Sequence, residues 1–415
     1  MNTLRIVYKN IKQRSLSSML TILSVLLGVG LVTAILILKN ESEEAFNQAA
    51  TGYEIIVGPK GSSLQLTLST VYQIGLPIQN MPIKVYDLLK NDKRVRLAIP
   101  YVFGDNYKNF RITGTVSELF SEFEYKKGIR YKLDEGSFFS NDFEAVIGKE
   151  VADKTGLKTG DTFSGSHGIE TYEGASEHSE KKFKVTGILS RTFTPSDRII
   201  FVSMNSVWEL HNHENENNGS EDHHIISDSM KTISAVLLKL KSPVFFDLLR
   251  RQINENKYEG INAQAVLPLF EIKQLFDIIG NINSVILVIA YLVIFTAAVS
   301  ILVSIYNSMN ERMREIAIMR SLGARRFLIM KIIIFEGMFL SAAGALLGCI
   351  AGHAAVFFLQ EKISGLSGIK ISGFVFSMFE VYLITGTVIL GIIVSIIPAV
   401  KAYRTDVSKN LNSGT

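Results

Sequence analysis

Four histidines gather in one polar stretch of the chain, and imidazole is the commonest side chain among protein metal ligands. They are His211, His213, His223 and His224, with acidic side chains in and beside the stretch. In an extended segment His211 and His213 point the same way, because side chains alternate between faces. We therefore expect the cluster to bind zinc. The alternative is a solvated polar loop in which histidine is one more hydrophilic residue.

The sequence carries no recognisable nucleotide site or catalytic group. Gly58-Pro-Lys-Gly-Ser-Ser63 hints at a phosphate loop but lacks the Gly-x-x-x-x-Gly-Lys-Ser/Thr spacing, and we interpret it as a turn. No nucleophile and base can be paired from the sequence. The net charge of +4 is too small to suggest nucleic acid. We therefore expect a chain that is not an enzyme, with no cofactor of its own apart from the zinc of the histidine cluster.

A basic linker, Asn310–Arg326, has the pattern of a docking helix for a protein partner. It reads Asn-Glu-Arg-Met-Arg-Glu-Ile-Ala-Ile-Met-Arg-Ser-Leu-Gly-Ala-Arg-Arg. Glu311 and Glu315 are one helical turn apart, and Gly323 suits a left-handed helix stop. The apolar face would consist of Ile316, Met319 and Leu322. The alternative is a juxtamembrane linker that sets topology and touches lipid headgroups.

Four apolar runs are long enough to cross a membrane. The chain is 47% hydrophobic with a mean hydropathy of +0.24, and about 20 helical residues cover the roughly 30 Å hydrocarbon layer. The first run exceeds the roughly 7–15 residues of a signal-peptide core, so we expect it to be retained. The runs are Ser17–Leu38, Ser284–Tyr306, Ile332–Leu359 and Val381–Val400.

Basic residues set the predicted orientation. They are concentrated before the first run, in the linker between the second and third runs, and in the tail, which places both termini and the linker in the cytoplasm. The predicted segments are a cytoplasmic amphipathic segment 1–16, span 17–38, extracytoplasmic domain with stalk helix 39–283, span 284–306, cytoplasmic coupling helix 307–331, span 332–359, extracytoplasmic link 360–380, span 381–400 and cytoplasmic tail 401–415.

The inserted region between the first two spans reads as a large α/β domain. Three segments rich in β-branched and aromatic residues predict strands, and Val244–Asn256 has helical spacing. Leu267–Asn281 continues without a strong breaker into the second span, so we expect one long stalk helix. Two polar stretches, Ser164–Lys182 and His211–Ser229, predict loops. The strand segments are Phe183–Leu189, Ile199–Val202 and Ala235–Leu240.

Inside the spans, small residues outnumber ionisable ones. A stripe of glycines in the third span allows close helix packing, either within one subunit or across a dimer. These are Gly344, Gly348 and Gly352.

Glu336 and His353 are the ionisable residues in the spans. We expect Glu336 to reach the headgroups and His353 to be a packed polar residue. This scarcity argues against an ion-driven transporter, which needs buried carboxylates or broken helices.

Three segments resemble the MacB/FtsX-type family of ABC transporter permeases, the membrane subunits of these transporters. The Glu-Arg-x-Arg-Glu-Ile and Arg-x-Leu-Gly-Ala pattern that begins at Glu311 is similar to the family's linker between its second and third spans. Leu4–Gly30 resembles its entry, and Ile397–Arg404 its closing Pro-Ala pattern, although Val407 stands where proline is usual.

The resemblance implies a cytoplasmic ATPase subunit that binds ATP, and a second permease subunit, identical or different. It also allows a soluble or lipid-anchored extracytoplasmic partner, in a bacterial cytoplasmic membrane. ATP hydrolysis would move the extracytoplasmic domain, in export, lipoprotein release or metal-related transport. The alternative is an ATP-independent membrane-anchored receptor or metal sensor. The residues expected to contact the ATPase are Glu311, Arg312, Arg314, Glu315, Ile316, Arg320 and Gly323.

Overall fold

The computed structural model describes residues 3–50, 52–166, 181–212, 231–258, 261–367 and 373–404. The chain divides into two compact units. The first, here called the membrane unit, comprises Met1–Glu41, Ile279–Glu361 and Ile371–Thr415; the second, here called the α/β unit, comprises Ser42–Ile278 and Lys362–Lys370. The α/β unit is inserted between the first and second long helices, as the sequence predicts.

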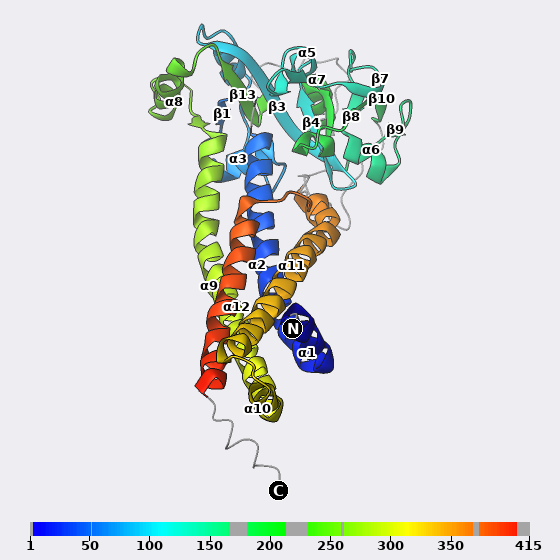
Figure 1. Cartoon of the computed structure of the whole chain (residues 1–415). Coiled ribbons are helices and arrows are strands. Elements are labelled where there is room, and N and C mark those ends of the chain that lie inside the picture. The colour runs from blue at the N-terminus through cyan, green and yellow to red at the C-terminus, as the bar shows by residue number, and fades with distance from the viewer. Residues whose placement is uncertain are drawn as a thin grey trace, which may run out of the picture. The chain divides into compact units, whose positions relative to one another are not determined.

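Four helices of the described chain are long and apolar enough to span a membrane, and each contains one of the predicted runs. Two short helices accompany them at one end of the bundle (Figure 1). The spanning helices are α2 (Ser15–Ala49), α9 (Pro268–Glu311), α11 (Arg326–Ser367) and α12 (Met378–Arg404), and the short ones are α1 (Thr3–Gln13) and α10 (Met313–Ser321).

Backbones approach closely where α11 crosses α2. A Cβ atom added at Gly348 would lie 2.8 Å from the carbonyl oxygen of Leu26, and one at Gly352 would lie 2.8 Å from that of Gly30. Gly344 has the same role against Val25. The glycine stripe therefore packs within the subunit, which answers the choice that the sequence left open. Without a hydrophobic drive between helices in lipid, such close contact supplies the packing energy.

Within the described residues, the α/β unit is built on a mixed sheet of ten strands and also contains two small two-stranded sheets (Figure 1). Its main order is β14-β1-β13-β3-β4-β11-β8-β10-β7, with β9 paired to β10. The strands are β1 (Ile55–Gly58), β2 (Met81–Pro82), β3 (Val95–Tyr107), β4 (Phe110–Thr115), β5 (Glu124–Lys126), β6 (Ile129–Arg130), β7 (Leu133–Gly136), β8 (Glu144–Ile147), β9 (Thr162–Phe163), β10 (Phe183–Leu189), β11 (Ile199–Ser203), β12 (Thr232–Ile233), β13 (Ala235–Leu240) and β14 (Gln264–Val266).

Both faces of the central strands β1, β8, β11 and β13 are buried, which is why these strands are largely apolar. Because side chains alternate, Ile200 and Val202 enter one core while Ile199 and Phe201 enter the other. Helices cover the two faces. They are α3 (Ser63–Val71), α4 (Lys84–Lys90), α5 (Glu118–Ser121), α6 (Lys149–Thr155), α7 (Met204–Asn212) and α8 (Phe246–Asn254), with short 3₁₀ turns at Pro195–Arg198 and Pro243–Phe245.

The three predicted strands and the long stalk helix are confirmed, and two details differ. Val244 is 82% exposed in a 3₁₀ turn, and the helix expected from that residue begins at Phe246. The fourth predicted run ends at Val400, but α12 continues through Pro398 to Arg404. The polar stretches predicted as loops lie largely outside the described residues, but His211 and Asn212 complete α7.

Candidate functional site

Helix α10 lies in the predicted linker, and its end is set by a signal in its own sequence. Gly323 adopts a φ of +95°, which an L-residue with a side chain rarely adopts. The amide of Gly323 donates to the carbonyl of Arg320, and that of Ala324 donates to the carbonyl of Met319. These two bonds are the Schellman arrangement, which satisfies the last carbonyls of a helix. The predicted left-handed stop is therefore confirmed.

The predicted apolar face of α10 divides between interior and surface. Ile316 is 6% exposed and packs in the core of the membrane unit, together with Ala317. Leu322, assigned to the same face, is 82% exposed. Arg314 and Glu315 are also exposed. Ile316 therefore holds α10 onto the bundle, and its contact with a partner stays a prediction.

Glu311 and Glu315 do not share one helix face. Helix α9 ends at Glu311, and the chain turns at Arg312, whose φ of −105° and ψ of 9° are not helical. Glu311 forms an ion pair with Arg14, and Arg312 donates to the carbonyl of Asn10 at 3.2 Å. The i, i+4 spacing assumed an uninterrupted helix. The turn instead directs these two residues to the N-terminal segment and leaves Glu315 to the surface.

A cavity of about 310 Å³ lies between α1, α9, α10 and α11. Its walls are largely aliphatic, and Ile6, Met309 and Met319 come from three of those helices. Glu336 also lines it, is 6% exposed, and accepts a hydrogen bond from Ser308 at 3.4 Å. The expectation that Glu336 reaches the headgroups is therefore wrong, because the neighbouring helices enclose it.

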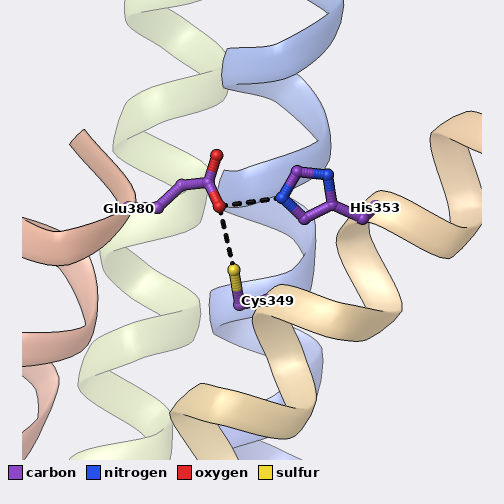
Figure 2. Close-up of side chains that lie close together, drawn as sticks. All are labelled: Cys349, His353 and Glu380. Carbon is purple, nitrogen blue, oxygen red and sulfur yellow. Dashed lines mark hydrogen bonds and ion pairs between the residues drawn. The ribbon is translucent and has the colours of Figure 1, made fainter. Parts of the chain in front are cut away.

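Glu380 is a second buried carboxylate. The sequence assigns it to the external link 360–380, but it belongs to α12. Glu380 is 1% exposed. Its Oε2 atom lies 3.0 Å from Cys349 Sγ and 2.8 Å from His353 Nε2, both on α11 (Figure 2). Ser377-x-x-Glu380 has the spacing of a capping box, a signal that could have placed the start of α12. No local pattern, however, pairs that start with α11.

The histidine cluster is only marginally covered by the described residues. His211 lies in the last turn of α7, and His213, His223 and His224 lie outside the described residues. The zinc site predicted for them therefore stays a prediction. Among the described residues, the Cys, His and acidic side chains close enough to hold a metal ion are Cys349, His353 and Glu380.

Models of known protein families match residues of both units. The model of the MacB-like periplasmic core domain matches residues 18–256, which is more than half of the chain, and that of the FtsX-like permease C-terminal region matches residues 287–407. The chain belongs to the MacB/FtsX family of ABC transporter permeases. A MacB/FtsX permease is a membrane protein, in agreement with the four candidate spans.

Relatives of this MacB/FtsX permease are distant in sequence. An uncharacterized ABC transporter permease of Methanocaldococcus jannaschii is 22% identical over 378 residues, covering 87% of this chain and 84% of the relative. The uncharacterized ABC transporter permease YvrN of Bacillus subtilis is 22% identical over 97% of both chains. The macrolide export ATP-binding/permease protein MacB of Rhodopirellula baltica is 26% identical over 133 residues, 31% of this chain and 19% of that protein.

Solved structures resemble parts of the chain. The extracellular domain of the noncanonic ABC-type transporter YknZ from Gram-positive bacteria is 14% identical, with a TM-score of 0.29 over 51% of this chain and 98% of that one. The periplasmic region of MacB from Actinobacillus actinomycetemcomitans is 13% identical, with a TM-score of 0.33 over 55% of this chain and 94% of that one.

Proposed function

We propose that this permease is the membrane subunit of an ABC transporter in which a separate cytoplasmic ATPase subunit docks on α10. The chain itself would catalyse nothing. ATP hydrolysis in the partner would shift α10, and α9 would carry that movement to the α/β unit on the opposite side of the membrane. A second permease subunit would complete the complex. Both termini would face the cytoplasm, as the basic residues suggest.

The observation that carries the proposal is the surface of α10. The helix is fixed from within by Ile316 and Ala317, while its outer side presents Arg314, Glu315 and Leu322 to solvent. An 82% exposed leucine between charged groups resembles the central apolar contact and polar rim of a protein interface. A linker that only set topology would need the positive charge but not a rigidly held, capped helix.

Helix α9 offers the route for movement because each of its ends belongs to a hydrophobic core. In the α/β unit, Ile272 is fully buried and Phe276 packs edge-on against Phe46, with ring centroids 5.5 Å apart. In the membrane unit, Ile301 and Ile305 join the core that also contains Ile316. Both sets of residues belong to one helix, α9, whose 44 residues are about 66 Å long at 1.5 Å per residue.

Co-purification tests the docking surface. The full-length permease, solubilised in detergent from cells that express it naturally, should retain an ABC ATPase subunit that mass spectrometry identifies. Leu322→Asp should reduce retention by about tenfold or more, because a buried unpaired charge at an interface centre costs at least about 1.4 kcal/mol. Val244→Asp is the matched control, since Val244 is also 82% exposed but lies in the α/β unit.

Two outcomes would count against the proposal. If Leu322→Asp retains the ATPase as well as Val244→Asp does, α10 is not the docking surface. If the unmodified permease retains no ATPase at all, coupling to ATP is wrong, and the receptor or metal-sensor alternative takes its place.

A further inference from the structure

We propose that Cys349, His353 and Glu380 form a binding site for a divalent transition metal ion of the zinc class. Cys349 and His353 are four residues apart on α11 and therefore share one helix face. Glu380 comes from the first turn of α12 and points into the same space (Figure 2). Two helices thus bring a thiol, an imidazole and a carboxylate together inside the membrane unit.

The three ligand atoms already converge. Sγ of Cys349, a ring nitrogen of His353 and a carboxylate oxygen of Glu380 all lie within 4.8 Å of one another. A single atom, Oε2 of Glu380, lies within hydrogen-bonding distance of both partners, at 3.0 Å from Sγ and 2.8 Å from Nε2. Replacing the protons held between these atoms with one cation would leave every donor atom directed at the ion.

The surroundings orient each ligand for that role. Nδ1 of His353 lies 2.7 Å from the carbonyl oxygen of Gly373, and because a carbonyl can only accept, Nδ1 donates. The neutral ring then carries its lone pair on Nε2, the atom that faces Glu380. A backbone carbonyl in this position is the usual outer partner of a metal-bound histidine.

The second carboxylate oxygen of Glu380 is held separately. Oε1 accepts from the amide of Ser377 at 2.9 Å, which closes the capping box of α12. Capping explains Oε1 fully but gives no role to Oε2, which faces away from the cap and toward α11. The carboxylate is therefore fixed in orientation, with Oε2 directed at Cys349 and His353, where the ion would lie.

A buried hydroxyl adds a further polar atom. Thr33 on α2 is fully buried and its Oγ1 makes no well-formed hydrogen bond. It lies beside the Cys349 thiol. A metal-bound thiolate, or a water in the fourth position of the ion, would satisfy this hydroxyl. The Thr33 hydroxyl, in weak contact with the thiol, adds a polar wall beside the three converging ligands.

The donor set selects the metal. Sulfur, nitrogen and oxygen together suit zinc, and three protein ligands with one open position is a common zinc arrangement. Tetrahedral zinc, with bonds of about 2.0–2.3 Å, separates its ligand atoms by about 3.3–3.5 Å. Oε2 would have to move away from its two partners by about 0.5 Å, which a small side-chain rotation allows. The bound ion would link α11 to the start of α12.

Cobalt(II) is the direct probe, because thiolate-to-cobalt charge transfer gives a near-ultraviolet band and this chain has one cysteine. Full-length permease in detergent should give the band on titration with cobalt, and zinc should abolish it by displacement. Cys349→Ser should lose the band completely. His353→Gln and Glu380→Gln should each weaken cobalt binding by about 10-fold or more, because even the loss of a group that only orients a ligand typically costs about that much.

Two controls separate this site from other metal binding and from misfolding. Replacing His211, His213, His223 and His224 with alanine should leave the band unchanged, because those residues carry no sulfur. Glu336→Gln removes a second buried carboxylate of the membrane unit and should also leave the band unchanged. Each variant must elute as a single species in gel filtration before titration.

The proposal is overturned by either of two results. One is the absence of a band up to millimolar cobalt in protein whose Cys349 still reacts with a thiol reagent after denaturation. The other is an equal band in the unmodified chain, His353→Gln and Glu380→Gln, which would mean that cobalt contacts the thiol alone.

Discussion

The membrane unit and the α/β unit are held together by opposite means. In the membrane unit, the tightest contacts are made by the smallest residues, as where Gly348 of α11 lies against the backbone of α2. In the α/β unit, the largest side chains fill the interior, and Phe201 and Tyr72 are almost completely buried. Lipid gives helices no hydrophobic reason to associate, so close backbone contact matters there, whereas water drives the burial of bulk.

The chain offers a separate reporter for each unit. Its one tryptophan, Trp208, lies in the α/β unit and donates to the carbonyl of Thr232 at 2.8 Å. Its one cysteine, Cys349, is 7% exposed in the membrane unit. Tryptophan fluorescence and thiol reactivity therefore follow the two units independently in one full-length protein. If the comparison is right, a substitution in one unit should change mainly the reporter of that unit.

The largest effect is expected from Gly348→Leu. The added side chain would meet backbone atoms of Leu26 and Gly30, which cannot rotate away, so we expect a loss of at least about 3 kcal/mol. Cys349 should become reactive while the Trp208 unfolding midpoint stays unchanged. Gly386→Leu is the control, because a Cβ atom at Gly386 meets nothing within 4 Å. Equal thiol reactivity in the two variants would refute the role of the glycine stripe.

An effect of similar size is expected from Phe201→Ala in the α/β unit. Phe201 is fully buried and packs against the rings of Phe120 and Tyr131, so its removal should cost about 3–5 kcal/mol. The measurement is denaturant unfolding followed by Trp208 fluorescence, with Cys349 reactivity unchanged. Val244→Ala at an exposed site should have almost no effect. A loss below about 1 kcal/mol for Phe201→Ala would mean that bulk does not stabilise this unit.

The smallest of the three effects concerns a charge network in the α/β unit. Hydrogen bonds from Arg94, with help from Tyr258, lower the pKa of Asp92 to about 2 despite its burial. Because the folded-state pKa is depressed, the stabilisation is present above pH 4 and is lost as pH falls from about 4 to 2. We expect about 2 kcal/mol, since each pKa unit corresponds to about 1.4 kcal/mol.

Asp92→Asn checks that value. The variant should unfold more easily than the unmodified chain at pH 6, and the difference should vanish near pH 2, with Trp208 as the probe. Lys154→Ala, which breaks an exposed pair with Glu150 on α6, should change stability by at most about 0.5 kcal/mol at any pH. A constant difference between Asp92→Asn and the unmodified chain from pH 6 to pH 2 would show that the carboxylate charge is not what stabilises this network.

Features that depend on a short stretch of chain could be predicted from the sequence. The strands Phe183–Leu189 and Ala235–Leu240 were placed with their observed bounds, because a run rich in β-branched and other apolar residues between polar segments is local information. The four spans follow from length and hydropathy in the same way. The left-handed stop at Gly323 follows from one residue type after a helical pattern. Each of these depends on neighbours within a few residues.

The tertiary structure decided which distant residues meet. His353 read as a lone histidine because Glu380, 27 positions later, lay in what seemed to be an external link. Ile316 and Leu322 looked alike on a helical pattern, but only packing against α9 and α11 buries the first and exposes the second. Glu311 and Glu315 lie on different helices because one non-helical residue, Arg312, interrupts the chain between α9 and α10. Such outcomes depend on the free energy of contacts between helices. The spacing of residues along one helix carries no information about that free energy.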